Sequence, residues 1–133
     1  MPPGPSTKWL EPVSWEDVTA INARLCEARN ALHKPASDGH DAARDLWESS
    51  RQMVLTLEQA IVICHRCHRL APFCFFNGNS FVAIARGIIR PVLEQLTARD
   101  AMRAAAFRSV VGHFVAGTEG LEELRAALRE ALD

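Results

Sequence analysis

The chain lacks an excess of basic residues and any long hydrophobic run. Its 133 residues include 15 basic and 16 acidic side chains, for a net charge of −1. Nucleic-acid binding normally relies on a basic face or stripe, so we expect no nucleic-acid partner. No hydrophobic run approaches the roughly 20 residues that a membrane-spanning helix needs. We therefore expect no membrane association.

The N-terminus also lacks the features of a secretion signal. Residues 1–7 contain neither a basic stretch nor a hydrophobic one. We therefore expect a cytoplasmic protein, in which the four cysteines stay reduced. Four of the seven prolines lie within residues 1–13. This composition predicts an extended, mobile N-terminal arm over 1–13, followed by one domain over 14–133.

Helical patterns occupy most of the remaining chain, and no segment has the alternation of a β-strand. Ser14, followed by two acidic residues, predicts the start of a helix that ends before Pro35. Its apolar face is expected to run as far as Leu32. Thr56 and Gln59 have the spacing of a capping box at the start of another helix. Further apolar patterns predict helices over about 41–54, 57–70, 80–97, 100–115 and 121–132.

Two of these segments carry more specific expectations. The segment 57–70 is apolar over a wide arc, which predicts the buried centre of a helical bundle. Asn79 or Ser80 is expected to cap the next helix, and Pro91 within that helix predicts a kink or a break. Leu121 to Leu132 carries a leucine stripe that would suit a homodimer. The fold class that follows is all-α, a single-domain bundle of about six helices.

The segment 73–81, between two predicted helices, reads F-C-F-F-N-G-N-S-F. It resembles the signature loop of the Fic/Doc family, H-x-F-x-[D/E/N]-G-N-[G/K]-R. The positions that agree are Phe75, Asn77, Gly78 and Asn79. Phe73 stands in place of the family's catalytic His, and Phe81 in place of its phosphate-binding Arg. A frame that begins two residues earlier, at Ala71, supplies no base either.

This resemblance implies a Fic/Doc-like bundle whose chemistry has changed. Working members transfer AMP or a phosphoryl group to a target hydroxyl. The family His acts as the general base, and Phe73 has no titratable group to replace it. Phe81 cannot form the charge-assisted bonds that the family Arg makes to phosphate. Gly78, Asn79 and Ser80 could still bind a phosphate through the amides of a helix N-terminus. We therefore expect a degenerate or repurposed member without AMP or phosphoryl transfer.

The substitutions predict that the former nucleotide cleft has become an apolar pocket for a small molecule. Phe73 and Phe81 would line this pocket, and Asn77 and Asn79 would orient the ligand. The full set of expected ligand-binding residues is Phe73, Phe75, Phe76, Asn77, Gly78, Asn79, Ser80 and Phe81. If the bound molecule is also transformed, the candidate reactive side chains are His68, Cys64 and Cys74.

Two other classes of function fit parts of the sequence. One is a non-catalytic regulatory module that binds a protein partner, as antitoxin-like proteins do. The other is an HEPN-type RNase, because Arg108 and His113 have the R-x₄-H spacing of that class. Arginine and histidine together can stabilise charge and transfer protons during phosphodiester cleavage.

The cysteine-containing helix also matches two cofactor patterns. Residues 64–68 read C-x-x-C-H, the pattern of covalent haem attachment, which requires export. A zinc site could combine Cys64, Cys67 and Cys74 with His68 or His113. Both cysteines of the C-x-x-C pair fall inside an apolar helical pattern, which favours buried free thiols. We therefore expect no metal and no cofactor.

Overall fold

A computed structural model describes residues 6–132 of the chain and confirms the all-α class. This part of the chain contains two isolated β-bridges but no strand. The helices are α1 (Trp15–Ala28), α2 (His40–Arg51), α3 (Leu57–Leu70), α4 (Asn77–Ile88), α5 (Arg90–Arg99), α6 (Ala101–Ala116) and α7 (Leu121–Leu132). None of them combines the length and the hydrophobicity that a membrane span requires.

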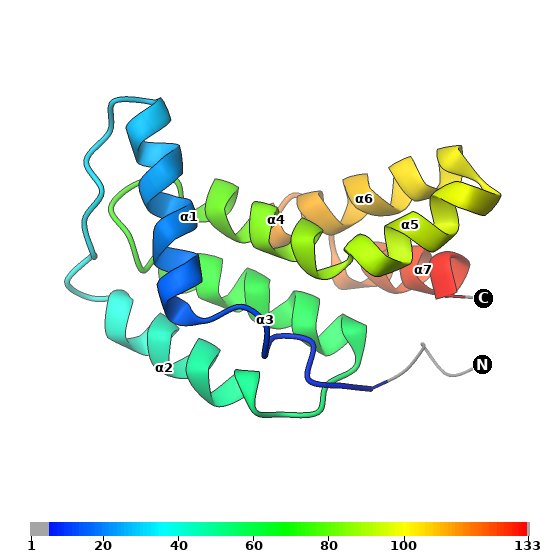
Figure 1. Ribbon diagram of the computed structural model, residues 1–133, viewed down its shortest axis with the longest axis horizontal. Coiled ribbons are helices and arrows are strands. Elements are labelled where there is room, and N and C mark those ends of the chain that lie inside the picture. The colour runs from blue at the N-terminus through cyan, green and yellow to red at the C-terminus, as the bar shows by residue number, and fades with distance from the viewer. Residues whose placement is uncertain (1–5, 133) are drawn as a thin grey trace.

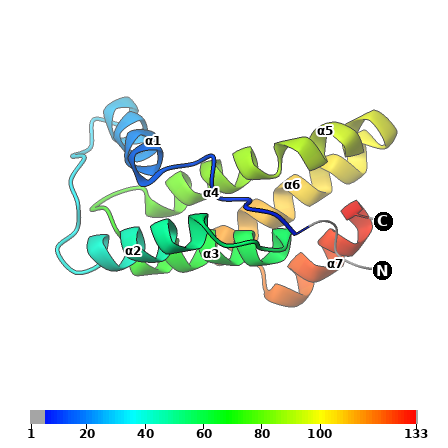
Figure 2. The same cartoon turned by 60° about the horizontal axis from the view of Figure 1, so that its bottom comes forward.

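Helix α4 lies at the centre of the bundle (Figure 1). It packs against α3 and α6, and α1 crosses it at a steep angle (Figures 1 and 2). Helix α2 covers α3, while α5 and α7 pack on α6. The first turn of α4 therefore lies where α1, α3 and the end of α6 come together.

Side-chain caps fix two helix starts where the sequence predicted them. The Ser14 hydroxyl accepts a hydrogen bond from the Asp17 amide, and the Asp17 carboxylate accepts one from the Ser14 amide. Thr56 and Gln59 form the same reciprocal pair at the start of α3. Each capping box provides partners for backbone donors that a helix start leaves without an acceptor.

The described chain has seven helices because Pro91 divides the predicted fourth one. Ile89 ends α4 and begins α5, and Pro91 stands in the first turn of α5. Proline lacks an amide hydrogen and clashes with the preceding turn, so it kinks or breaks a helix, and here it breaks it. The predicted caps of α4 are wrong. The helix begins at Asn77, and Phe76 occupies the cap position with a left-handed φ of 61°.

Helix α1 ends earlier than its apolar pattern predicts. Asn30 adopts a left-handed φ of 53°, which a short polar side chain tolerates. The amide of Ala31 then donates to the carbonyl of Cys26, closing the helix in the manner of a Schellman motif. Leu32, predicted to lie on the apolar face, is therefore outside the helix and 62% exposed.

The N-terminal segment packs against the domain from residue 6 onward. Residues 1–5 of the predicted mobile arm lie outside the described residues. Thr7 exchanges two backbone hydrogen bonds with Leu55, at 3.0 and 2.8 Å. Leu10 is completely buried, and the carbonyl of Val13 accepts a hydrogen bond from Trp47. The boundary predicted after residue 13 therefore does not separate a mobile arm from the domain, because residues 7–13 are part of the packed structure.

The core confirms one prediction and removes the basis of another. Helix α3 is buried over a wide arc, as expected, with Ile61, Cys64 and Cys67 completely enclosed. The leucine stripe of α7 packs into the same core, where Leu124 and Leu128 are buried. That stripe is therefore not available as the dimer interface that the sequence suggested.

Candidate functional site

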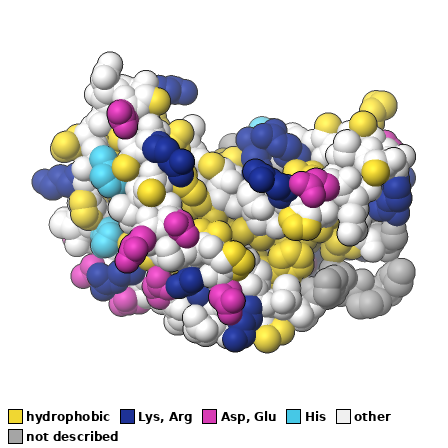
Figure 3. Space-filling view, viewed as in Figure 1, with side chains coloured by type: hydrophobic (Ala, Val, Ile, Leu, Met, Phe, Trp, Pro, Cys, Tyr) yellow, Lys and Arg dark blue, Asp and Glu magenta, His cyan; other side chains and the backbone are white. Residues whose placement is uncertain are grey.

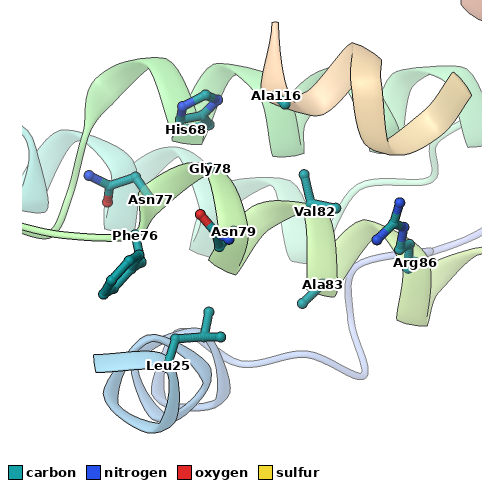
Figure 4. Close-up of a pocket in the computed structure, with 10 residues that line it drawn as sticks. All are labelled: Leu25, His68, Phe76, Asn77, Gly78, Asn79, Val82, Ala83, Arg86 and Ala116. Carbon is teal, nitrogen blue, oxygen red and sulfur yellow. The ribbon is translucent and has the colours of Figure 1, made fainter. Parts of the chain in front are cut away.

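A cavity of about 640 Å³ opens at the first turn of α4. We call it the first cavity (Figure 4). Leu25 of α1 borders it on one side of α4, and His68 and Ala116 border it on the other. The remaining lining residues all belong to the start of α4 or follow along it: Phe76, Asn77, Gly78, Asn79, Val82, Ala83 and Arg86.

Three backbone amides point out of the start of α4 without an acceptor. Within residues 6–132, no group accepts a hydrogen bond from the amides of Asn77, Gly78 or Asn79. Unpaired amides and the aligned peptide dipoles make a helix N-terminus favourable for an anion. This end of the cavity therefore presents partial positive charge.

His68 presents a proton acceptor to the same turn. Its Nδ1 lies 2.8 Å from the carbonyl oxygen of Val115. A carbonyl oxygen only accepts hydrogen bonds, so Nδ1 carries the hydrogen and Nε2 of the neutral ring is left as an acceptor. Nε2 faces Gly78, because a Cβ placed on that glycine would lie 3.3 Å from it. The missing side chain of Gly78 therefore leaves room for the imidazole above the helix start.

Arg86 places a cation further along the cavity wall (Figure 4). Its Nε is shielded from solvent and has no hydrogen-bond partner among the described residues. Burial lowers the pKa of its guanidinium from the ordinary value, and the nearby Arg108 adds to this effect. Gly112 of α6 makes room for it, since a Cβ there would lie 2.7 Å from Arg86 Nη2. A half-buried arginine next to another arginine is a favourable place for an anion.

A buried asparagine that the sequence analysis missed holds the loop before α4. Asn22 of α1 is completely buried, and its Nδ2 donates to the carbonyl of Phe75 at 2.7 Å and to the Ser80 hydroxyl at 3.0 Å. Its Oδ1 lies 2.8 Å from Nδ1 of His33. A signal was present in the sequence, because Asn22 lies between Val18 and Cys26 at four-residue spacing on the buried face of α1.

The prediction that Phe73 and Phe81 line the cavity is wrong. Phe73 is 1% exposed and stacks on Trp15, with ring centroids 5.8 Å apart. Phe81 is completely buried, and its ring lies 6.1 Å from that of Trp47. Both side chains turn into the core because large indole surfaces from α1 and α2 are available to them there.

Three further residues of the motif also have other roles. Ser80 is completely buried and donates to the carbonyl of Phe76 at 2.7 Å, so it cannot reach a ligand. Both polar atoms of the Asn77 side chain are bound to the backbone of Phe73, so it does not orient a ligand as predicted. Phe75 is 49% exposed and does not border the cavity. Of the predicted set, Phe76, Asn77, Gly78 and Asn79 do border it.

The cysteine candidates are not placed for reaction. Cys64 is completely buried, and burial together with Cys67 raises the pKa of its thiol. Burial likewise raises the pKa of Cys67 to about 12. A thiol with a raised pKa is a poor nucleophile at neutral pH. Cys74 is exposed but does not border the first cavity. Of the three predicted reactive residues, His68 alone borders it.

The structure gives no support to an RNase site at Arg108 and His113. Both are exposed on α6, and Nδ1 of His113 lies 2.9 Å from the Thr118 hydroxyl. Neither residue borders the first cavity. Arg108 acts on the candidate site only through its charge, by its effect on Arg86.

Burial also bears on the frame of the Fic/Doc resemblance. Phe75, which was matched to the phenylalanine of the family motif, is exposed, whereas Phe73 is buried. No family model matches the chain, and no curated protein or solved structure matches it significantly. The site is therefore interpreted from its own geometry.

Proposed function

We propose that the protein binds a small phosphate-bearing molecule in the first cavity, with its phosphate at Arg86 and its other polar groups at the start of α4. The observation that carries this proposal is the unpaired Arg86 guanidinium, half-buried beside Arg108 with no carboxylate against it among the described residues. A bound anion would supply the partner that this cation lacks. Charged hydrogen bonds of this kind are the strong ones in proteins.

The free amides of Asn77, Gly78 and Asn79 support the same assignment. They lie along one wall with Arg86, so donors are available at both ends of the cavity. Leu25, Val82 and Ala116 provide apolar surface between these ends. A cavity of a few hundred Å³ with apolar walls and a few polar groups has the make-up of a small-molecule site.

His68 gives the site a base as well as a binding surface. Its Nε2 is an acceptor that faces Gly78 in the first turn of α4, where it can take a proton from a ligand bound there. In this proposal His68 and Arg86 supply the base and the cation that the Fic/Doc signature loop would have placed at positions 73 and 81. The proposed likeness to the Fic/Doc family is confined to the phosphate site.

Isothermal titration calorimetry with inorganic pyrophosphate, AMP and adenosine tests the proposal. We expect pyrophosphate and AMP to bind and adenosine to bind at least tenfold more weakly, because it lacks the charged group. Arg86→Gln should weaken AMP binding by about tenfold to a hundredfold, since a hydrogen bond to a charged group is lost.

Arg99→Gln is the matched control. Arg99 is exposed at the end of α5 and does not border the cavity, so its removal changes the net charge equally without touching the site. Equal affinity for AMP and adenosine would contradict the proposal. Equal losses in Arg86→Gln and Arg99→Gln would also contradict it, because they would show attraction by net charge alone.

A further inference from the structure

A second cavity, of about 620 Å³, lies on the other side of Ala83 from the α4 N-terminus. We call it the second cavity. Its walls come from residues 7–13, from α1 and from the junction of α4 and α5. Figure 3 shows hydrophobic side chains along the hollow on this face, between α1 and the end of the molecule formed by α5 and α6. The proposed phosphate site does not use this space.

The wall formed by the N-terminal segment is held in place. Thr7 is bonded to Leu55 through two backbone hydrogen bonds, and Leu10 is completely buried. Trp47 Nε1 donates to the carbonyl of Val13 at 2.9 Å, and Arg51 donates to the carbonyl of Glu11. The second cavity is therefore preformed, as most small-molecule sites are.

The floor of the second cavity is apolar and contains an open recess. Ile84 and Ile88 of α4 and Pro91 of α5 line it. Between the two isoleucines stands Gly87, and no atom lies within 4 Å of the position that a Cβ would take there. A glycine in the last turn of α4 without a crowded neighbour leaves helix surface bare, and an apolar ligand could cover that surface.

The charged residues that border the second cavity are both cations. Lys8 and Arg90 line it, and none of its described lining residues is acidic. Lys8 approaches Glu11 only at 3.9 Å, with both side chains about half exposed. Such an exposed pair is weak, so Lys8 remains available for a ligand. The cavity thus combines an apolar floor with positive charge.

We propose that the second cavity binds an apolar carboxylic acid. The hydrocarbon part lies on Ile84, Gly87 and Ile88, and the carboxylate lies at Lys8 and Arg90. A neutral apolar molecule would make no use of the two cations. A cationic amphiphile would be repelled by them.

Calorimetric titration with decanoate, well below the concentration at which it forms micelles, tests this inference. Decanol and decyltrimethylammonium serve as matched neutral and cationic probes. We expect decanoate to bind about fivefold or more tightly than decanol, and the cationic probe to bind more weakly still. Arg90→Gln should make the affinities for decanoate and decanol nearly equal. Arg99→Gln should leave the difference between the two affinities unchanged. No binding of decanoate, or equal binding of all three probes, would overturn the proposal.

The Gly87→Leu variant tests whether the acid binds in the second cavity. The new side chain occupies the open recess, and leucine favours a helix more than glycine does, so the fold should be kept. We expect decanoate affinity to fall about tenfold or more, while pyrophosphate binding in the first cavity persists. If Arg86→Gln abolishes decanoate binding and Gly87→Leu does not, the acid occupies the first cavity and the inference is wrong.

Direct contacts provide a second measurement that does not depend on the variants. Intermolecular nuclear Overhauser effects should connect decanoate methylene protons with the methyl groups of Ile84 and Ile88 and the ring of Trp9, which also lines the second cavity. Contacts with Leu25 and Val82 instead would place the ligand in the first cavity and would overturn the inference.

Discussion

Nδ1 of His68 lies 2.8 Å from the carbonyl oxygen of Val115, and this contact decides which ring nitrogen faces the first cavity. Nδ1 of His65, on the preceding turn of α3, lies 3.1 Å from the same oxygen. Val115 is in the last turn of α6, where carbonyl groups have no partner within the helix. Two imidazoles of α3 thus cap the end of α6, and one of them also borders the candidate site.

This relationship predicts different effects for two substitutions of His68. Asparagine places its amide nitrogen near the position of Nδ1, so His68→Asn should keep the bond to Val115 and lose the acceptor at Nε2. Glutamine reaches the Nε2 position instead, so His68→Gln should lose the bond and about 1 kcal/mol of stability. Urea unfolding of the two variants measures the difference. If the His68→Gln variant were more stable than the His68→Asn variant, the assigned tautomer would be contradicted.

Removal of the Asn22 side chain should destabilise the protein by about 3 kcal/mol. Asn22→Ala removes the partner of the buried Ser80 hydroxyl and of two partly buried groups, the Phe75 carbonyl and the His33 ring. Asn79→Ala, at an exposed position of α4, should stay within about 0.5 kcal/mol of the native value. Equal unfolding free energies of the two variants, measured in urea, would show that the network adds no stability.

Two Gly→Ala substitutions should change stability in opposite directions. A Cβ on Gly39 would overlap the backbone carbonyl oxygen of Leu70, so Gly39→Ala should cost about 1–3 kcal/mol. A Cβ on Gly87 meets no atom, so Gly87→Ala should add up to about 1 kcal/mol through helix propensity. Thermal unfolding followed by circular dichroism compares them. A neutral Gly39→Ala would mean that the α3 terminus can move away from α2.

The buried thiols predict a loss of stability at alkaline pH. Burial raises the pKa of Cys67 from its ordinary value of 9.0 to about 12, and it raises the pKa of Cys64 as well. Above pH 9 the unfolded chain releases these protons while the folded protein retains them, so unfolding becomes more favourable. Each thiol should lower the free energy of unfolding by about 1.4 kcal/mol per pH unit in the window from pH 9 to about 12.

The absence of tyrosine makes this effect measurable, because no phenol titrates in the same window. Cys67→Ala should roughly halve the slope of unfolding free energy against pH. An unchanged slope in Cys67→Ala would assign the effect to other groups. If the free energy of unfolding of the native protein did not change with pH across this window, the raised pKa values themselves would be contradicted.

Local chemistry explains which parts of the fold could be predicted from the sequence. The capping boxes at Ser14 and Thr56 and the break at Pro91 depend on side chains within a few residues of the boundary. The start of α4 does not, because Asn77 folds back onto Phe73 and Asn22 holds the same loop from a distant helix. The early end of α1 depends on the backbone conformation of Asn30, which the apolar pattern does not record.

The sequence predicted where the candidate site lies but not which residues line it. The loop before α4 does border a cavity, but its aromatic residues Phe73 and Phe81 turn toward Trp15 and Trp47. That choice depends on tertiary packing between segments far apart in the chain. Arg86 was missed because its significance comes from the missing side chain of Gly112 on another helix. His68 was predicted because it stands one turn before the loop.

Ala83 borders both cavities, so the two proposed ligands share a wall of α4. If the acid changes the affinity for phosphate by some factor, thermodynamic linkage requires phosphate to change the affinity for the acid by the same factor. Titration of each ligand in the absence and in the presence of the other would measure that factor. One alanine of α4 thereby lies between the two proposed ligands.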